Sequence, residues 1–167
     1  MSFNRQSSRL RQLFAAVASL LIAVLSACGG ETSQGGGHQD HKARKALGEP
    51  AEESEADRSI DVGMLDALKF EPIRIEVAAG EVVTFVVKNQ GALAHEFVLG
   101  DAKLQKEHAK EMAKAGAKME DSENAIRVPP SETKKLTWRF TEAGEVLYGC
   151  HEPGHYDAGM VGTIVVE

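Results

Sequence analysis

The sequence predicts an all-β sandwich with one short inserted α-helix, and three observations lead to this prediction. Short apolar runs recur from residue 59 onward and are separated by Gly and Pro, which is typical of small sandwich domains. A single stretch, residues 101–124, has helical instead of strand spacing. The chain has 167 residues, 43% of them apolar and 26% charged, which suits one globular domain with extensions but is short for two.

The first element in order is an export signal over residues 1–28. Three arginines precede an apolar run, residues 13–25, and small residues follow it. This run is too short to favour a spanning helix, which needs about 20 apolar residues. The ending Leu-Ser-Ala-Cys resembles the lipobox of bacterial lipoproteins, so we expect lipidation at Cys28; the alternative is an ordinary secretory cleavage site. We therefore expect a periplasmic, membrane-anchored protein, and Gly29 favours the outer membrane.

Residues 29–58 are expected to be a flexible tether. They are rich in Gly, Glu, Ser and Ala and contain almost no large apolar residues. Such a segment cannot bury enough surface to offset its chain entropy. The globular domain is therefore expected to span residues 59–167.

The strands follow in that domain. Ile73, Ile75 and Val77 alternate with charged residues, which indicates a strand with one buried face. Further along the chain, Leu136, Trp138 and Phe140 alternate with polar residues and share one face. Six strands are expected in all, at residues 73–81, 81–89, 95–101, 133–140, 144–150 and 160–167.

The inserted segment at about 101–124 is expected to be an amphipathic helix. Leu104, His108, Met112, Ala115 and Met119 recur at spacings of three, four and seven residues, so they would share one face.

Charge and cysteine content exclude some functions. Removing the signal leaves 16 of the 19 basic residues against 25 acidic ones, so nucleic acid, which requires a basic surface, is not an expected partner. If Cys28 carries lipid, Cys150 is the only free thiol and has no intramolecular partner. It could still be a small buried hydrophobe or half of an intermolecular disulfide.

Around that thiol, residues 148–160 read YGCHEPGHYDAGM and place soft metal donors at short spacing. Four residues separate Cys150 from His155, and four more separate His155 from Met160; a thiolate, an imidazole and a thioether together suit copper. A second imidazole is needed, and His95 at a strand start is the best candidate. His151 should point away from the metal because neighbours on an extended chain face opposite sides, and we expect it to be exposed or to tune the site from outside.

Two quoted stretches carry a family resemblance: FEPIRIEVAAGEVVTFVVKNQGALAHEFVLGD and YGCHEPGHYDAGMVGTIVVE. Together they resemble the cupredoxin family of blue-copper proteins, and the Cys-x4-His-x4-Met loop is most similar to rusticyanin and auracyanin types. The resemblance covers about residues 68–167, interrupted by the insert. It implies a Greek-key β-sandwich with one type 1 copper site, cycling between Cu(I) and Cu(II), whose ligands are His95, Cys150, His155 and Met160. The chain also resembles periplasmic cupredoxins linked to copper tolerance.

Further residues outside the loop are possible secondary copper contacts. His108 and Met112, with Met119 below them, could hold Cu(I) on the helix, although Met at such positions is more often packing. His38 and His41 in the tether could bind Cu(II) weakly.

Two functions follow as expectations. One is a one-electron carrier whose partner is a redox protein, such as a periplasmic cytochrome or oxidase. The alternative is a copper-tolerance protein that binds, sequesters or oxidises surplus copper. We do not expect an enzyme, because a binuclear site of the oxidase type needs two cysteines on the loop and a multicopper oxidase needs additional His-rich motifs.

Overall fold

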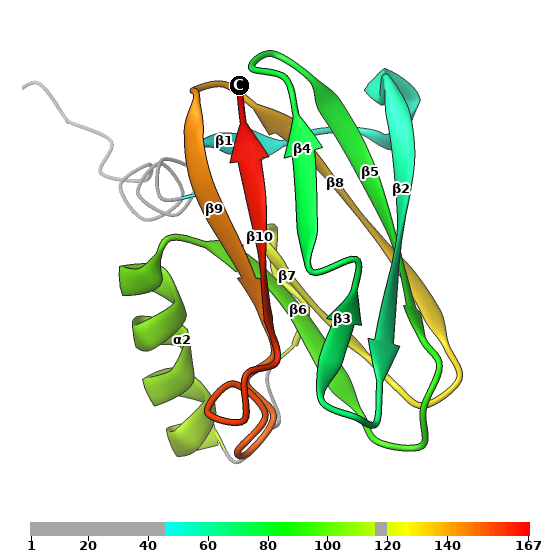
Figure 1. The fold of residues 1–167 in the computed structure, drawn as a ribbon, viewed down its shortest axis with the longest axis vertical. Coiled ribbons are helices and arrows are strands. Elements are labelled where there is room, and N and C mark those ends of the chain that lie inside the picture. Colours follow the sequence, from blue (N-terminus) through cyan, green and yellow to red (C-terminus); the bar gives the residue numbers. More distant parts are fainter. Residues whose placement is uncertain (1–45, 116–119) are drawn as a thin grey trace, which may run out of the picture. The chain divides into compact units, whose positions relative to one another are not determined.

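The computed structural model describes residues 46–115 and 120–167, which form two β-sheets and one α-helix (Figure 1). The first sheet has the order β1 (Gly48–Pro50), β8 (Thr133–Phe140), β5 (Val82–Asn89), β2 (Arg58–Leu65) and β3 (Lys69–Glu71). The second has the order β4 (Arg74–Val77), β10 (Val161–Val166), β9 (Gly144–Gly149), β6 (His95–Gly100) and β7 (Ala125–Val128). A 3-10 turn, η1 (Glu53–Glu55), separates β1 from β2, and α2 (Ala102–Ala115) separates β6 from β7. The predicted all-β Greek-key sandwich with an inserted helix is confirmed.

The core lies between the two sheets and is built around aromatic side chains. Phe70, Phe85, Phe97 and Tyr148 are fully buried, and the Tyr148 ring centre lies 5.1 Å from that of Phe70 and 5.2 Å from that of Phe97. Burying each such side chain contributes about 1.5–3 kcal/mol. This core fixes β6 and β9, which carry Phe97 and Tyr148, as a rigid pair.

The alternation predicted for β8 is confirmed, whereas that for β4 is only partly correct. Leu136, Trp138 and Phe140 are buried, and so are Ile75 and Val77. The first apolar residue of the β4 pattern, Ile73, is instead 65% exposed. It lies in the connection between β3 and β4, outside the strand whose pleat would have turned it inward.

The expected tether was wrong for its described part, residues 46–58. Ala46 is fully buried, and its carbonyl accepts a hydrogen bond from the Trp138 indole N–H at 3.2 Å. Strand β1 pairs with β8, and β2 begins at Arg58. Backbone hydrogen bonds hold this segment on the sheet. Such bonds need no large apolar side chains, so the composition of the segment did not predict that it is ordered.

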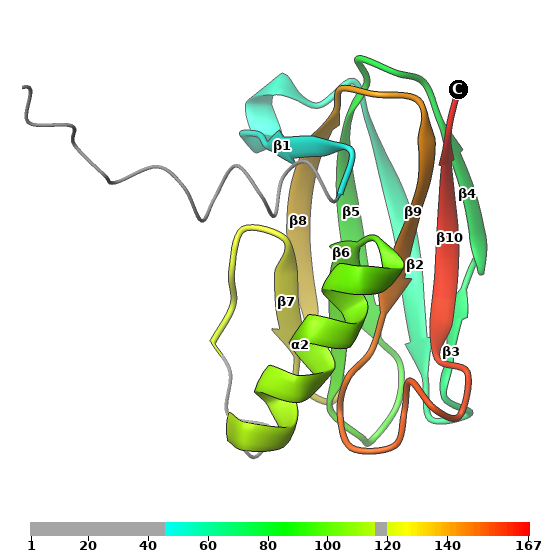
Figure 2. The same cartoon turned by 90° about the vertical axis from the view of Figure 1, so that its left-hand side faces the viewer.

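The helix is confirmed, but it is shorter than the predicted range. The Asp101 carboxylate accepts the N–H of Leu104 at 2.7 Å, as the residue before a helix commonly does. Residues 120–124 are not helical, and Asn124 donates its side-chain amide to the Leu99 carbonyl at 2.7 Å. Figure 2 shows α2 beside the second sheet, where it contacts β6 and β9.

The export signal, Cys28 and residues 29–45 of the tether lie outside the described residues. Within the described ranges, no helix combines the length and apolar character needed to cross a membrane.

Candidate metal centre

Three metal-binding side chains meet where β6 begins and β9 ends. Because β6 pairs antiparallel with β9, with Val98 opposite Gly149, His95 at the start of β6 lies beside Cys150 just after β9. His155 comes from the loop that follows, and the ligand atoms of all three lie within 4.8 Å of one another. The structure therefore brings together three of the four predicted copper ligands.

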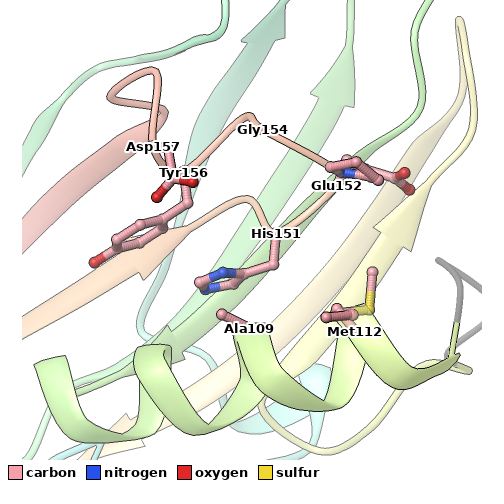
Figure 3. Close-up of a pocket in the computed structure, with 9 residues that line it drawn as sticks. Ala109, Met112, His151, Glu152, Gly154, Tyr156 and Asp157 are labelled. Carbon is pink, nitrogen blue, oxygen red and sulfur yellow. The ribbon is translucent and has the colours of Figure 1, made fainter.

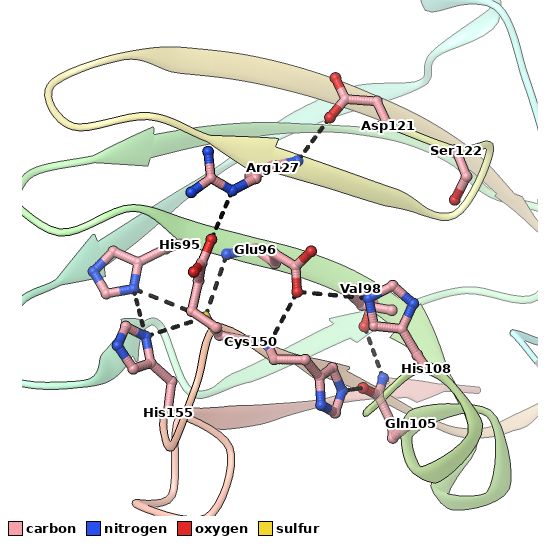
Figure 4. A network of polar contacts seen from close by, with 12 residues as sticks. His95, Glu96, Val98, Gln105, His108, Asp121, Ser122, Arg127, Cys150 and His155 are labelled. Carbon is pink, nitrogen blue, oxygen red and sulfur yellow. Dashed lines mark hydrogen bonds and ion pairs between the residues drawn. The ribbon is translucent and has the colours of Figure 1, made fainter. Parts of the chain in front are cut away.

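The donor atoms face one another closely (Figure 4). The two imidazole Nδ1 atoms of His95 and His155 are 3.2 Å apart. The Cys150 Sγ atom lies 3.8 Å from Nδ1 of His95 and 3.4 Å from Nδ1 of His155. Atoms at these separations can all reach one ion at bond lengths of about 2.0–2.3 Å. A thiolate with two imidazoles is the trigonal donor set of copper electron-transfer sites.

Met160, the fourth predicted ligand, is fully buried at the end of the same loop. The loop folds back on itself: the Cys150 N–H donates to the Met160 carbonyl at 3.2 Å, and the Met160 N–H donates to the His155 carbonyl at 3.0 Å. Gly154 and Gly159 have φ values of 83° and 93°, a conformation that side chains disfavour. These turns reverse the chain, so that the backbone of Met160 lies beside that of Cys150.

Burial dominates the acid–base behaviour of Cys150, which is fully buried. Burial raises the pKa of the thiol to about 12, whereas hydrogen bonds from the backbone N–H groups of Glu96 and Glu152 lower it by less. The Glu96 N–H donates to Sγ at 3.3 Å. A metal ion must therefore displace a proton from this thiol.

His95 is also fully buried, and burial is the main cause of its lowered pKa. With Nδ1 facing Cys150 and His155, its Nε2 atom is left without a hydrogen-bond partner. The nearest carboxylate oxygen, Oδ1 of Asp66, lies 3.9 Å from it. Neutral imidazole with a free Nδ1 lone pair is the form that binds a metal.

Asp66 also holds the loop that leads into His95. Its carboxylate accepts the N–H of Ala92 at 2.9 Å and that of Leu93 at 3.1 Å, and these hydrogen bonds lower the pKa of the carboxyl. This role of Asp66 could not be predicted from the sequence, because nothing in the local pattern links Asp66 to a loop 26 residues away.

His151 does not join the three donors, as predicted. Of the two alternatives for its surroundings, exposure is wrong, and tuning of the site from outside stays a prediction. His151 is only 6% exposed. Its ring stacks on that of Tyr156 at 4.6 Å between centres, and its Nε2 atom lies 2.7 Å from Oε1 of Gln105 on α2. The helix covers this side of the loop, and burial lowers the pKa of His151 to about 4.

The predicted secondary contacts are only partly described. His108 and Met112 are buried on α2, 7% and 3% exposed, and neither belongs to the group of three donors. Met119, His38 and His41 lie outside the described residues.

The fold and this donor set together define a copper-binding cupredoxin. The chain belongs to the plastocyanin/azurin family of copper binding proteins, whose family model matches residues 56–167.

Known proteins of similar sequence and structure agree with this assignment. The copper-resistant cuproprotein CopI of Rubrivivax gelatinosus is 37% identical over 160 residues, covering 94% of this chain and 96% of the relative. CopI of Pseudomonas aeruginosa is 40% identical and covers 74% of this chain and 83% of the relative. Among solved structures, auracyanin A, a "blue" copper protein from Chloroflexus aurantiacus, aligns with a TM-score of 0.55 at 27% identity, over 65% of this chain and 98% of that one.

We predict that copper binding releases about one proton between pH 8 and 9. The pKa of Cys150 is raised to about 12, so the thiol is protonated in this range, whereas the lowered pKa of His95 leaves that ring neutral. Apparent copper affinity should therefore rise about tenfold per pH unit. Calorimetry in buffers of different ionisation enthalpy measures the released protons. Cys150→Ser should release none, and a wild-type protein that also releases none would contradict the prediction.

We also predict that Asp66→Ala lowers copper affinity by about tenfold or more, because the loop before His95 loses its anchor. Competition with a copper chelator measures the change. Asp61→Ala, which removes an exposed carboxylate on β2, serves as the matched control. Equal affinities in the two variants would show that Asp66 does not position the site.

Proposed function

We propose that this protein holds one copper ion in a type 1 site formed by His95, Cys150, His155 and Met160, and that it transfers single electrons through it. The observation that carries the proposal is the buried group of one thiol and two imidazoles within 4.8 Å. Copper bound by such donors supplies a one-electron couple between Cu(I) and Cu(II).

The protein frame around the donors suits this role. The Glu96 N–H holds Sγ of Cys150, and backbone hydrogen bonds fix the loop between Cys150 and Met160. His95, Cys150 and Met160 are fully buried, which excludes water from most of the donor set. Donors held in one arrangement limit the rearrangement that accompanies a change of copper charge, which favours fast electron transfer.

The cellular role that we propose is copper tolerance, through binding, sequestering or oxidising surplus copper. Its support is the similarity to two relatives named copper-resistant cuproproteins, at 37% and 40% identity. The second candidate is a dedicated electron carrier with a redox partner such as a periplasmic cytochrome or oxidase. That candidate is favoured by the structural similarity to a blue copper protein. Neither role requires the chain to be an enzyme.

We further propose that the protein is exported to the periplasm and anchored by lipid on Cys28, with the outer membrane favoured. The arginines, the apolar run and the Leu-Ser-Ala-Cys ending of residues 1–28 support this location.

Replacing Cys150 and its neighbour His151 in turn should show which of the two residues binds the copper ion. Cys150→Ser removes the thiolate, so the intense visible absorption of the copper-loaded protein should be lost. His151→Ala should keep that absorption, because His151 is not one of the three clustered donors. Absorption and paramagnetic resonance spectra of both variants provide the test. Strong colour in Cys150→Ser would refute the proposed site.

A cellular assay should distinguish the two roles. Deleting the gene should reduce growth in copper-supplemented medium, wild-type protein should restore growth, and Cys150→Ser should not. A growth defect that is independent of added copper would instead favour the electron carrier.

A further inference from the structure

A cavity of about 250 Å³ lies between α2 and the loop that follows Cys150 (Figure 3). Met112 and two alanines line it from the helix, and His151 and Tyr156 line it from the loop. None of the three clustered donors His95, Cys150 and His155 lines this cavity. It is therefore a separate place next to the proposed copper site.

His151 presents a free lone pair in this region. The Gln105 amide nitrogen donates to the Val98 carbonyl at 2.7 Å, so the amide oxygen is the atom that faces His151. Because that oxygen can only accept, Nε2 of His151 must donate to it. In a neutral imidazole the other nitrogen, Nδ1, then carries the lone pair and is available as a metal ligand.

Two further donors come from α2. His108 and Met112 are four residues apart, so they project from the same face of the helix. The His108 ring centre lies 5.2 Å from that of His151, and its Nε2 atom is buried without a hydrogen-bond partner. Figure 3 shows the Met112 side chain extending from the helix toward the loop. Met112 and His151 thus line the same cavity from two elements, and His108 adjoins His151 from beside the cavity without lining it.

A buried carboxylate supplies negative charge beside them. Oε2 of Glu96 lies 3.5 Å from Nε2 of His108, and the two side chains are only 4% and 8% exposed (Figure 4). Buried charges in proteins are paired or coordinate metals. The thioether makes the donor set soft, which favours monovalent copper over harder cations.

We propose that His108, Met112 and His151 form a second site, for monovalent copper, with Glu96 as its counter-charge. This site goes beyond the proposed type 1 centre, since an electron carrier needs only one copper ion.

The test uses the full chain with methionine methyl groups labelled with ¹³C, in a background of His38→Ala and His41→Ala so that those two histidines do not contribute. Cu(I) is added without oxygen, and the methyl signals are followed by nuclear magnetic resonance. The Met160 signal should shift with copper at the proposed type 1 site and the Met112 signal with a further equivalent, whereas Met64 in the core should not respond. A Met112 signal that does not move through three equivalents would overturn the second site, and an unresponsive Met160 would count against the type 1 site instead.

Two variants separate metal binding from a purely structural role of this cluster. Met112→Leu conserves volume and removes the sulfur, so affinity for the second Cu(I) should fall at least about tenfold; Met64→Leu is the matched control. His151→Phe keeps a ring to stack on Tyr156 and removes the nitrogen donor, so it should cause a similar loss. If Met112→Leu and His151→Phe both bind as much Cu(I) as the control with unchanged affinity, the cluster only fastens the helix and the proposal is wrong.

Discussion

The antiparallel pairing of β6 with β9 is the constraint on which the proposed copper site depends. It places His95 beside Cys150, although the two residues are 55 positions apart in the sequence. The same two strands carry Phe97 and Tyr148 into the core, so packing of the sandwich and geometry of the donors are fixed by one interaction. The N–H of Glu96 then ties β6 directly to the Cys150 sulfur. Packing of the core therefore helps to hold His95 and Cys150 in place, in addition to the hydrogen bonds of the loop.

Elements with regular apolar spacing could be predicted from the sequence, and so could donors with close spacing. Strand β8 and helix α2 have such patterns, and the loop from Cys150 to Met160 concentrates its donors in eleven residues. Strand β1 and the role of Asp66 could not be predicted in this way. Both depend on hydrogen bonds to residues distant in the sequence, and hydrogen bonds of this kind leave no periodic signal.

The surroundings of His151 could be predicted only in part from the sequence. Alternation along an extended chain correctly predicted that its ring does not join the donors around Cys150. It could not show that Gln105 and Tyr156 would enclose the ring. Which side a residue faces is a local property, whereas what covers that side is decided by the docking of the inserted helix. The insert thus turns an expected surface histidine into a buried one.

The peptide bond between Cys150 and His151 therefore joins two different environments, the donor group on one side and the helix-covered cavity on the other. If an ion on one side displaces this dipeptide, the planar peptide unit that the two residues share moves on the other side as well. Thermodynamic linkage requires such an effect to be reciprocal: whatever factor filling one side imposes on affinity at the other, the reverse order of filling imposes the same factor. The order in which two ions load therefore leaves the final free energy unchanged and can alter only the rate of loading.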